Sequence, residues 1–208
     1  MRRALKILEL LKKAYPSSKI ALKVKNPLET LVATILSAQC TDKRVNIVTE
    51  ILFKKYKTVR DYAKANEKKF GSEIRSTGFY RNKAKNIIES AKKIIKDFNG
   101  KVPETMEALL ALPGVARKTA NIILYNGFGI IEGIAVDTHV RRLSQRLELS
   151  RNDDPVKIER DLMEIYPKKE WANLSNLLID HGRKICIAKK PRCPECVLNE
   201  FCPSAGKI

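Results

Sequence analysis

The fold of this chain is set by residues 112–120, which read LPGVARKTA. Pro113 ends an apolar helix predicted over residues 103–112, and Gly114 allows a tight turn before a second helix begins. The backbone N–H groups at the start of that second helix have no partner within the helix, and the helix dipole favours an anion there. A phosphate fits such a site without any side chain. The segment therefore predicts a helix, a turn and a helix, with Gly114 and Ala116 beside a bound phosphate.

Two residues near this turn carry groups that can do chemistry. Lys118 lies one turn beyond the phosphate site, and Asp137 lies nineteen residues later, between apolar residues in the sequence VDTHV. A carboxylate in such a setting is more often buried against a partner than fully solvated. Taken alone, the turn is equally well explained as an ordinary connection between helices with a solvated lysine nearby.

A cluster of cysteines near the end of the chain is the second strong feature. The pattern is C-x6-C-x2-C-x5-C, formed by Cys186, Cys193, Cys196 and Cys202. The sequence opens MRRA without an apolar leader, so a reducing, cytoplasmic environment is expected and disulfides are not. Thiolates this close together bind a metal, and both zinc and a [4Fe–4S] cluster accept four of them. The spacing barely separates the two metal centres, and ligand chemistry alone favours zinc slightly.

The charge balance points to a polyanionic partner. Lys and Arg total 41 against 23 Asp and Glu, which gives a formal net charge of +18. On a compact protein this charge attracts nucleic acid, although lysine-rich surfaces also serve solubility. The longest apolar stretch, Leu31 to Ala38, is interrupted by Thr34 and Ser37 and is far shorter than the ~18–20 apolar residues that span a bilayer. We therefore expect a monomer that binds nucleic acid and no membrane.

Apolar residues recur at helical spacing along nearly the whole chain, and no segment alternates with a period of two. Besides the two helices around the turn, helices are predicted over residues 28–38 and 170–184. Thr41 or Asp42 can cap the helix that follows the first of these. Asp154 followed by Pro155 is an N-cap and first-turn signal for a further helix, which extends to about Tyr166. The fold class predicted from this pattern is all-α.

The block from Leu112 to Asp137 resembles the helix-hairpin-helix motif and the catalytic Asp of the endonuclease III family of DNA glycosylases. The cysteine spacing, with the basic sequence AKKPR between the first two cysteines, looks like the iron–sulfur loop of the same family. This resemblance implies that the four cysteines hold a [4Fe–4S] cluster rather than zinc. It also implies that Lys190 and Arg192 of this loop contact DNA.

Two further segments match the family. Residues 36–42, LSAQCTD, look like the segment whose Gln enters the duplex where a nucleotide has been flipped out, which assigns that role to Gln39. Residues 78–80, GFY, look like the opposite loop, which pushes a bulky apolar side chain, here Phe79, into the base stack. Side chains that fill the vacated gap offset part of the cost of extruding a base. Without the family, Gln39 is explained as a polar helix end and Phe79 as a loop anchor.

The resemblance also implies two helical lobes with a cleft between them. A helical barrel domain with the hairpin would comprise residues 20–130, and an iron–sulfur domain would comprise residues 1–19 and 131–208. The cleft would bring Lys118 and Asp137 face to face. The chain departs from the family pattern at Ala116, which stands where the hairpin usually has its second glycine. A left-handed alanine would cost about 1–2 kcal/mol, so either the turn differs or this position is not left-handed, and the amide remains in both cases.

The function implied by the resemblance is that of a bifunctional DNA glycosylase and abasic-site lyase acting on oxidised pyrimidines in double-stranded DNA. Lys118 would displace the base at C1′ and form a Schiff base that permits β-elimination, and Asp137 would accept a proton or stabilise developing positive charge.

Two alternatives remain open. A monofunctional mismatch glycosylase on the same scaffold would use water, and the presence of Lys118 counts against it. A non-catalytic helix-hairpin-helix module with a structural metal explains the charge, the turn and the cysteines. It leaves the pairing of Lys118 with Asp137 as a coincidence.

Overall fold

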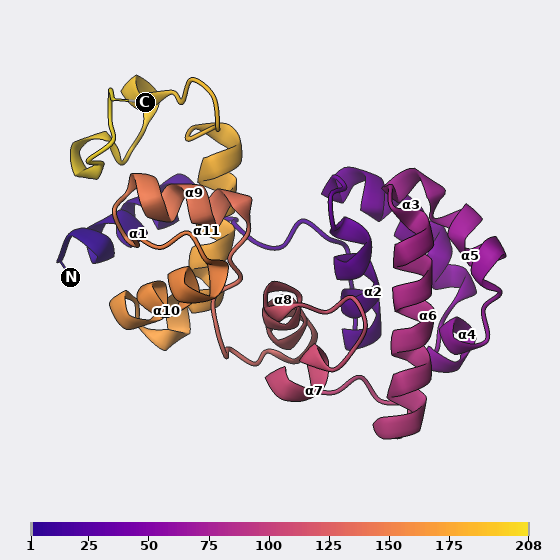
Figure 1. The fold of residues 1–208 in the computed structure, drawn as a ribbon. Coiled ribbons are helices and arrows are strands. Elements are labelled where there is room, and N and C mark those ends of the chain that lie inside the picture. Colours follow the sequence, from indigo (N-terminus) through magenta and orange to yellow (C-terminus); the bar gives the residue numbers. More distant parts are fainter. Residues whose placement is uncertain (1, 208) are drawn as a thin grey trace. The chain divides into compact units, whose positions relative to one another are not determined.

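A computed structural model of the chain describes residues 2–207, and every regular element in that range is helical (Figure 1), which confirms the predicted all-α class. The chain divides into two compact units. The first, Ile20–Ile130, contains the turn at residues 112–120 and is called here the hairpin unit. The second, Met1–Lys19 with Ile131–Ile208, contains the cysteine cluster and is called the cysteine unit. Each unit has its own hydrophobic core.

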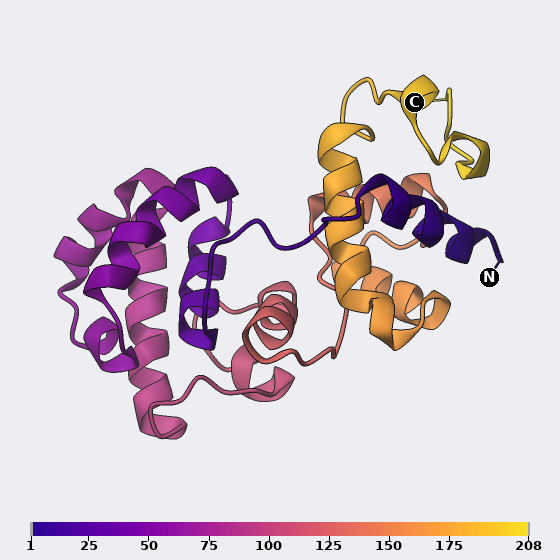
Figure 2. The ribbon, with the colours of Figure 1, turned by 180° about the vertical axis from the view of Figure 1, so that it is seen from behind.

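The hairpin unit is built around one buried helix. Its elements are α2 (Pro27–Ser37), α3 (Asp42–Lys55), α4 (Val59–Ala63), α5 (Glu67–Glu73), a 3-10 turn η1 (Arg75–Thr77), α6 (Tyr80–Asp97), α7 (Met106–Leu110) and α8 (Arg117–Phe128). Figures 1 and 2 show α2 between α8 on one side and α3 and α6 on the other. Residues 30–36 of α2 are all buried, since this helix is surrounded by its neighbours.

Side-chain caps fix where these helices begin. Asn26 caps α2 by accepting a hydrogen bond from the amide of Glu29 at 2.9 Å, and Pro27 occupies the first turn, where no amide partner is needed. Of the two candidates for capping α3, Thr41 is the cap and Asp42 is the first helical residue. The helix predicted over residues 28–38 is confirmed as α2, which begins and ends one residue earlier than predicted.

The helix before the turn is shorter than predicted. The sequence suggested residues 103–112, whereas α7 spans Met106–Leu110. The hydroxyl of Thr105 accepts a hydrogen bond from the amide of Ala108 at 3.3 Å, so the helix starts after Thr105 and not at Pro103. The predicted start was wrong because Thr105, two residues after Pro103, caps the helix and so sets its first residue.

The cysteine unit joins the two ends of the chain. Its elements are α1 (Arg2–Ala14), α9 (Thr138–Arg146), α10 (Pro155–Ile165), a 3-10 turn η2 (Lys168–Glu170), α11 (Trp171–Lys184) and two 3-10 turns, η3 (Cys193–Glu195) and η4 (Asn199–Phe201). Helix α1 packs against α11, which also packs against α9 (Figure 2). The guanidinium of Arg3 donates to the carbonyl of Phe201 at 3.1 Å and so ties α1 to the cysteine loop.

The two helices predicted in this unit are present. Asp154 caps α10 through hydrogen bonds from the amides of Val156 and Lys157, and the helix ends one residue before the predicted Tyr166. The helix predicted over residues 170–184 starts at Trp171, after the separate turn η2. Across residues 2–207, no helix combines the length and hydropathy that crossing a bilayer requires.

Candidate active site and cysteine cluster

The turn between α7 and α8 has the geometry that its sequence predicts. The amide of Val115 donates to the carbonyl of Leu112 at 3.1 Å, and Gly114 has a φ of +78°, in the left-handed region where glycine is favoured. A side chain at Gly114 would also overlap Asn86 of α6, since a Cβ at this position would lie 2.8 Å from Asn86 Nδ2. Both the backbone angle and the close packing therefore require glycine here.

Ala116 is not in the left-handed region. Its φ of −95° and ψ of 171° are extended, and it precedes the first residue of α8 as the N-cap. The cost expected for a left-handed alanine therefore does not arise. No side-chain hydrogen bond caps α8 in the part of the chain that the structure describes, which leaves the start of this helix accessible to an external anion.

Lys118 is the second residue of α8 and lies in the hairpin unit, one helical position after Arg117. Its side chain is exposed, and among residues 2–207 no hydrogen bond or ion pair holds the amine. An exposed amine without a partner is sterically free to reach a bound molecule.

Asp137 lies in the cysteine unit, where it caps α9. One carboxylate oxygen, Oδ1, accepts hydrogen bonds from the amides of His139 and Val140, both at 2.8 Å. The side chain is half-buried, as expected, but its partner is a helix N-terminus rather than a basic side chain. Two donors on one oxygen fix the carboxylate's orientation. The capping role could have been found from the sequence, because Asp is a preferred N-cap and a polar helical run follows it.

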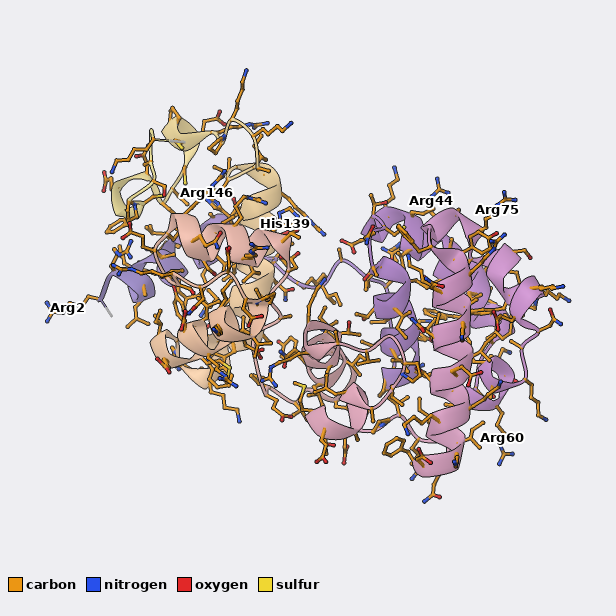
Figure 3. The ribbon with its side chains drawn as sticks, viewed as in Figure 1. Arg2, Arg44, Arg60, Arg75, His139 and Arg146 are labelled. Atoms are coloured by element: carbon orange, nitrogen blue, oxygen red, sulfur yellow. The ribbon has the colours of Figure 1, made fainter. Side chains whose placement is uncertain are left out.

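Gln39 and Phe79 share an unusual backbone conformation. Gln39 has a φ of 52° and Phe79 a φ of 47°, both in the left-handed region that residues with a side chain rarely adopt. Both side chains are exposed, and Phe79 leaves 64% of its surface accessible. Figure 3 shows Arg44 of α3 and Arg75 of η1 extending from the same end of the hairpin unit, and Arg60 from the opposite end. Gln39 precedes α3, and Phe79 follows η1 by two residues.

The four clustered cysteines surround one cavity. Cys186, Cys193, Cys196 and Cys202 all line it, together with Arg192 and Asn199. Cys40, the fifth cysteine, lies in the hairpin unit and packs against its core. Among the described residues no three His, Cys, Asp or Glu side chains converge closely enough to hold a single ion. The four thiols thus line a cavity and do not converge on the position of a single ion.

Comparisons with known proteins agree on one family. The model of the HhH-GPD superfamily base excision DNA repair proteins matches residues 32–168, and that of the iron–sulfur binding domain of endonuclease III matches residues 186–202. Endonuclease III of Synechocystis sp. is 53% identical over 98% of this chain and 93% of its own length. The chain belongs to the endonuclease III family.

Two solved structures match over nearly the full length. A non-covalent endonuclease III–DNA complex is 42% identical, has a TM-score of 0.95, and covers 99% of this chain and 96% of its own. A trapped endonuclease III–DNA covalent intermediate has the same identity and TM-score, with coverage of 99% and 97%. This member of the endonuclease III family is a base excision repair enzyme, a DNA glycosylase and abasic-site lyase, and it carries a [4Fe–4S] cluster.

The donor set around the cavity suits that cluster. Burial raises the pKa of the Cys196 and Cys202 thiols, and the neighbouring cysteines raise both further. Four thiolates therefore need a positively charged centre to share this site, and cluster irons supply one. Hydrogen bonds reach the sulfurs as well, with Arg146 donating to Cys186 Sγ at 3.3 Å and the amide of Leu198 donating to Cys196 Sγ at 3.4 Å.

His181 is a second contact of the cluster loop that the sequence did not reveal. Burial lowers its pKa to about 4, so the ring is neutral near pH 7. Nε2 lies 3.3 Å from Cys196 Sγ, and Nδ1 lies 2.9 Å from the hydroxyl of Tyr15 on α1. A neutral ring that accepts from Tyr15 at Nδ1 donates from Nε2 to sulfur. Nothing in the sequence links residues so far apart.

The two basic residues proposed for the cluster loop are both exposed. Lys190 has a φ of 55°, and Arg192 lies 3.8 Å from Glu195 in a surface ion pair. An exposed pair of this kind contributes little to stability, so Arg192 can exchange it for a phosphate at small cost.

Proposed function

We propose that this enzyme removes oxidised pyrimidines from double-stranded DNA and cleaves the resulting abasic site, with Lys118 as the nucleophile. The observation that carries the assignment is an exposed, unpartnered amine placed one residue inside the helix that follows the hairpin. The similarity to a trapped covalent endonuclease III–DNA intermediate supports an enzyme-bound step.

The chemistry of a primary amine accounts for both activities. In the neutral form, the Lys118 nitrogen attacks C1′ and the bond to the base breaks, so the base leaves with the bonding electrons and takes up a proton. Opening of the sugar ring gives a Schiff base between Nζ and C1′. Loss of a proton from C2′ then expels the 3′ phosphate, and water releases the sugar fragment from the lysine.

Asp137 is proposed as the second catalytic group. Its Oδ1 is held by two amides, and its other oxygen accepts no hydrogen bond from the described residues. That free oxygen can accept the proton of the amine or stabilise positive charge on the sugar as the base departs. The chemistry requires Lys118 and Asp137 to act on the same nucleotide.

The remaining assignments concern DNA contacts and the cluster. We propose that the amides at Gly114 and Ala116 bind a phosphate, that Gln39 and Phe79 fill the gap left by the flipped nucleotide, and that Lys190 and Arg192 contact phosphates. The cluster ligands are proposed to be Cys186, Cys193, Cys196 and Cys202. On these assignments the hairpin unit is the helical barrel domain and the cysteine unit is the iron–sulfur domain. The enzyme is proposed to act in the cytoplasm because its substrate is the cell's DNA.

Borohydride reduction tests the central proposal, since it converts a Schiff base into a stable covalent bond. Wild-type protein should become attached to duplex DNA containing one oxidised pyrimidine or one abasic site. Lys118→Gln should lose both the attachment and strand cleavage while still binding lesion DNA, because the phosphate is held by backbone amides. Lys101→Gln, an exposed lysine of the same unit, is the matched control and should behave as wild type.

Each failure has a distinct meaning. If Lys118→Gln still cleaves abasic DNA by elimination, Lys118 is not the nucleophile. If wild type releases the base without any covalent attachment, water is the nucleophile and the enzyme is monofunctional. If wild type binds DNA and releases no base from any oxidised pyrimidine, the proposed substrate class is wrong.

A further inference from the structure

The hairpin unit contains a buried lysine that the proposed chemistry does not use. Lys83, in the first turn of α6, is only 4% exposed. Its ammonium donates hydrogen bonds to the carbonyl oxygens of Leu36 and Thr77, each at 2.8 Å. Lysine is almost never this buried without a specific reason, because removing an ammonium from water is costly. Burial lowers the pKa of Lys83, as expected for a charge whose partners are neutral carbonyls.

The two carbonyls belong to segments far apart in the sequence. Leu36 lies in the last turn of α2, and Thr77 is the last residue of η1. Carbonyls at helix ends lack a partner within the helix and carry the negative end of the helix dipole. A single ammonium thus joins the end of α2 to the end of η1.

Each of these ends is followed within three residues by a left-handed residue. Gln39 follows Leu36 by three positions, and Phe79 follows Thr77 by two. Such a conformation costs about 1–2 kcal/mol at a residue with a side chain, and it persists only where the surroundings enforce it. The Lys83 side chain holds a backbone carbonyl ahead of each position, that of Leu36 before Gln39 and that of Thr77 before Phe79.

The same face of α6 also fixes the hairpin. Ser90, seven residues after Lys83, donates to the carbonyl of Pro113 at 2.8 Å. Residues seven apart lie on one side of a helix, so Lys83 and Ser90 form part of one polar stripe on a largely apolar helix face. The stripe anchors backbone carbonyls of three segments proposed to contact DNA.

We propose that Lys83 is a positioning residue that holds the turns of Gln39 and Phe79 in a fixed relation, so that both side chains enter the duplex together when a nucleotide is flipped out. This inference rests on the proposed roles of Gln39 and Phe79. Being buried, Lys83 itself does not touch the DNA.

Replacing Lys83 by methionine removes the ammonium and keeps the length of the side chain. Lys93→Met is the matched control, because Lys93 lies on the same helix and makes only a surface ion pair with Asp97. Both variants are compared with wild type on an oxidised pyrimidine in duplex DNA and on an abasic site in a single strand, where no base stack has to be opened. Far-ultraviolet circular dichroism and the visible absorption of the cluster report folding.

We expect Lys83→Met to slow excision from the duplex by about tenfold or more and to change cleavage of the single-stranded abasic site by less than about twofold, since only the first substrate must be opened. A fluorescent adenine analogue placed opposite the lesion should fluoresce less in the Lys83→Met complex than in the wild-type complex, because the base stack around it is opened less. Lys93→Met should match wild type in all three measurements.

A double-variant cycle separates this inference from the function on which it rests. In a Gln39→Ala, Phe79→Ala background, Lys83→Met should cause no further loss, because the side chains it positions are gone. If that background already excises the lesion at the wild-type rate, the proposed roles of Gln39 and Phe79 fail. If the background is impaired and Lys83→Met adds its full loss, the positioning role fails.

Two other outcomes also decide the question. Equal losses of Lys83→Met on both DNA substrates would show general structural support and overturn the positioning role, as would no loss on either. If Lys83→Met does not fold, Lys83→Arg replaces it, because arginine keeps the buried charge but its planar group displaces the two turns. A loss confined to the duplex substrate supports positioning, and full activity on both substrates overturns it.

Discussion

Asp137 combines a structural and a proposed chemical role in one side chain, and the two can be separated by mutation. Asparagine at this position still presents an oxygen to the amides of His139 and Val140, so α9 keeps its cap. Asp137→Asn should therefore fold normally yet slow base removal by about 10²-fold or more, as loss of an acid–base group does. Cleavage of a pre-formed abasic site should suffer far less, because no glycosidic bond breaks.

Single-turnover rates on the two DNA substrates, with thermal unfolding of each variant, measure this difference. Asp137→Ala is the companion variant and should also lose about 1 kcal/mol of stability, since the cap disappears. Equal losses of Asp137→Asn in both reactions would make Asp137 a structural support of the lysine, and no loss in either would remove it from the site.

Gly114 provides a second prediction at the residue scale. Gly114→Ala should lower the free energy of unfolding by about 1–2 kcal/mol from the left-handed angle alone, and by more because the new methyl group overlaps Asn86. Gly100→Ala is the control, since Gly100 has a φ of +75° with open space around its Cα. Denaturant titration should show a larger loss at Gly114, and adding Asn86→Ala should recover part of it. Equal losses at the two glycines would exclude the overlap.

Some of these residues could be predicted from the sequence and others could not. The tight turn at Gly114 and the grouping of the four cysteines around one cavity follow from short motifs, because the residues of each motif lie close together in the chain. Ala116 stayed ambiguous because its backbone angle depends on how the turn packs. Lys83 gave no signal, because a lysine in a charged helical segment normally faces solvent, and its acceptors are backbone carbonyls, one of them 47 residues away.

At the scale of elements, helix starts were predicted best where a cap and a proline coincide. Asp154 followed by Pro155 placed α10 correctly. At the helix before the hairpin, Pro103 follows Val102, which cannot cap a helix, and Thr105 caps α7 instead. Local residue preferences thus locate an element, and competition between neighbouring caps decides its bounds.

The cysteine loop carries a prediction of its own about DNA binding. Each phosphate contact contributes about 0.9 to the slope of log affinity against log salt concentration. Replacing Lys190 and Arg192 by alanine should reduce that slope by roughly one to two and weaken binding to damaged and undamaged duplexes alike, because phosphates carry no lesion information. Chemistry at saturating enzyme should stay close to the wild-type rate.

Lys168 and Lys169 serve as the control for this measurement. They are exposed residues of the same unit, and their replacement by alanine changes the net charge equally. An unchanged slope in the Lys190 and Arg192 variant would mean that the loop does not touch DNA. A loss confined to lesion-bearing DNA would place the loop beside the flipped base.

At the scale of the whole molecule, the tail of the cysteine unit differs from the rest of the chain in what holds it together. Both units have an apolar core, but Leu198 is the only fully buried apolar side chain in the described residues after Lys184. The cluster therefore takes the place of a core in this tail. Purified protein should be yellow-brown and contain about four irons, the content of a cubane cluster.

Removing a cysteine should release this tail without unfolding the hairpin unit. Cys193→Ala should give colourless protein whose residues after Lys184 are cleaved rapidly by protease, while Cys40→Ala should keep both the colour and the resistance. Iron analysis and limited proteolysis measure the two effects. Wild-type protein with one zinc and no iron would contradict the cluster, and a protease-resistant tail in Cys193→Ala would contradict its structural role.

The discontinuous cysteine unit also determines the order in which a nascent chain can mature. Helix α1, whose buried residues are Ala4, Ile7, Leu8 and Leu11, is synthesised before the hairpin unit. Helix α11, against which it packs, emerges only after the entire hairpin unit. The hairpin unit can complete its core during synthesis, because domains fold as units. Throughout that time the apolar stripe of α1 faces solvent and is available to chaperones. A nascent chain that stops before α11 would therefore contain a folded hairpin unit and a helix α1 whose apolar residues have nothing to pack against.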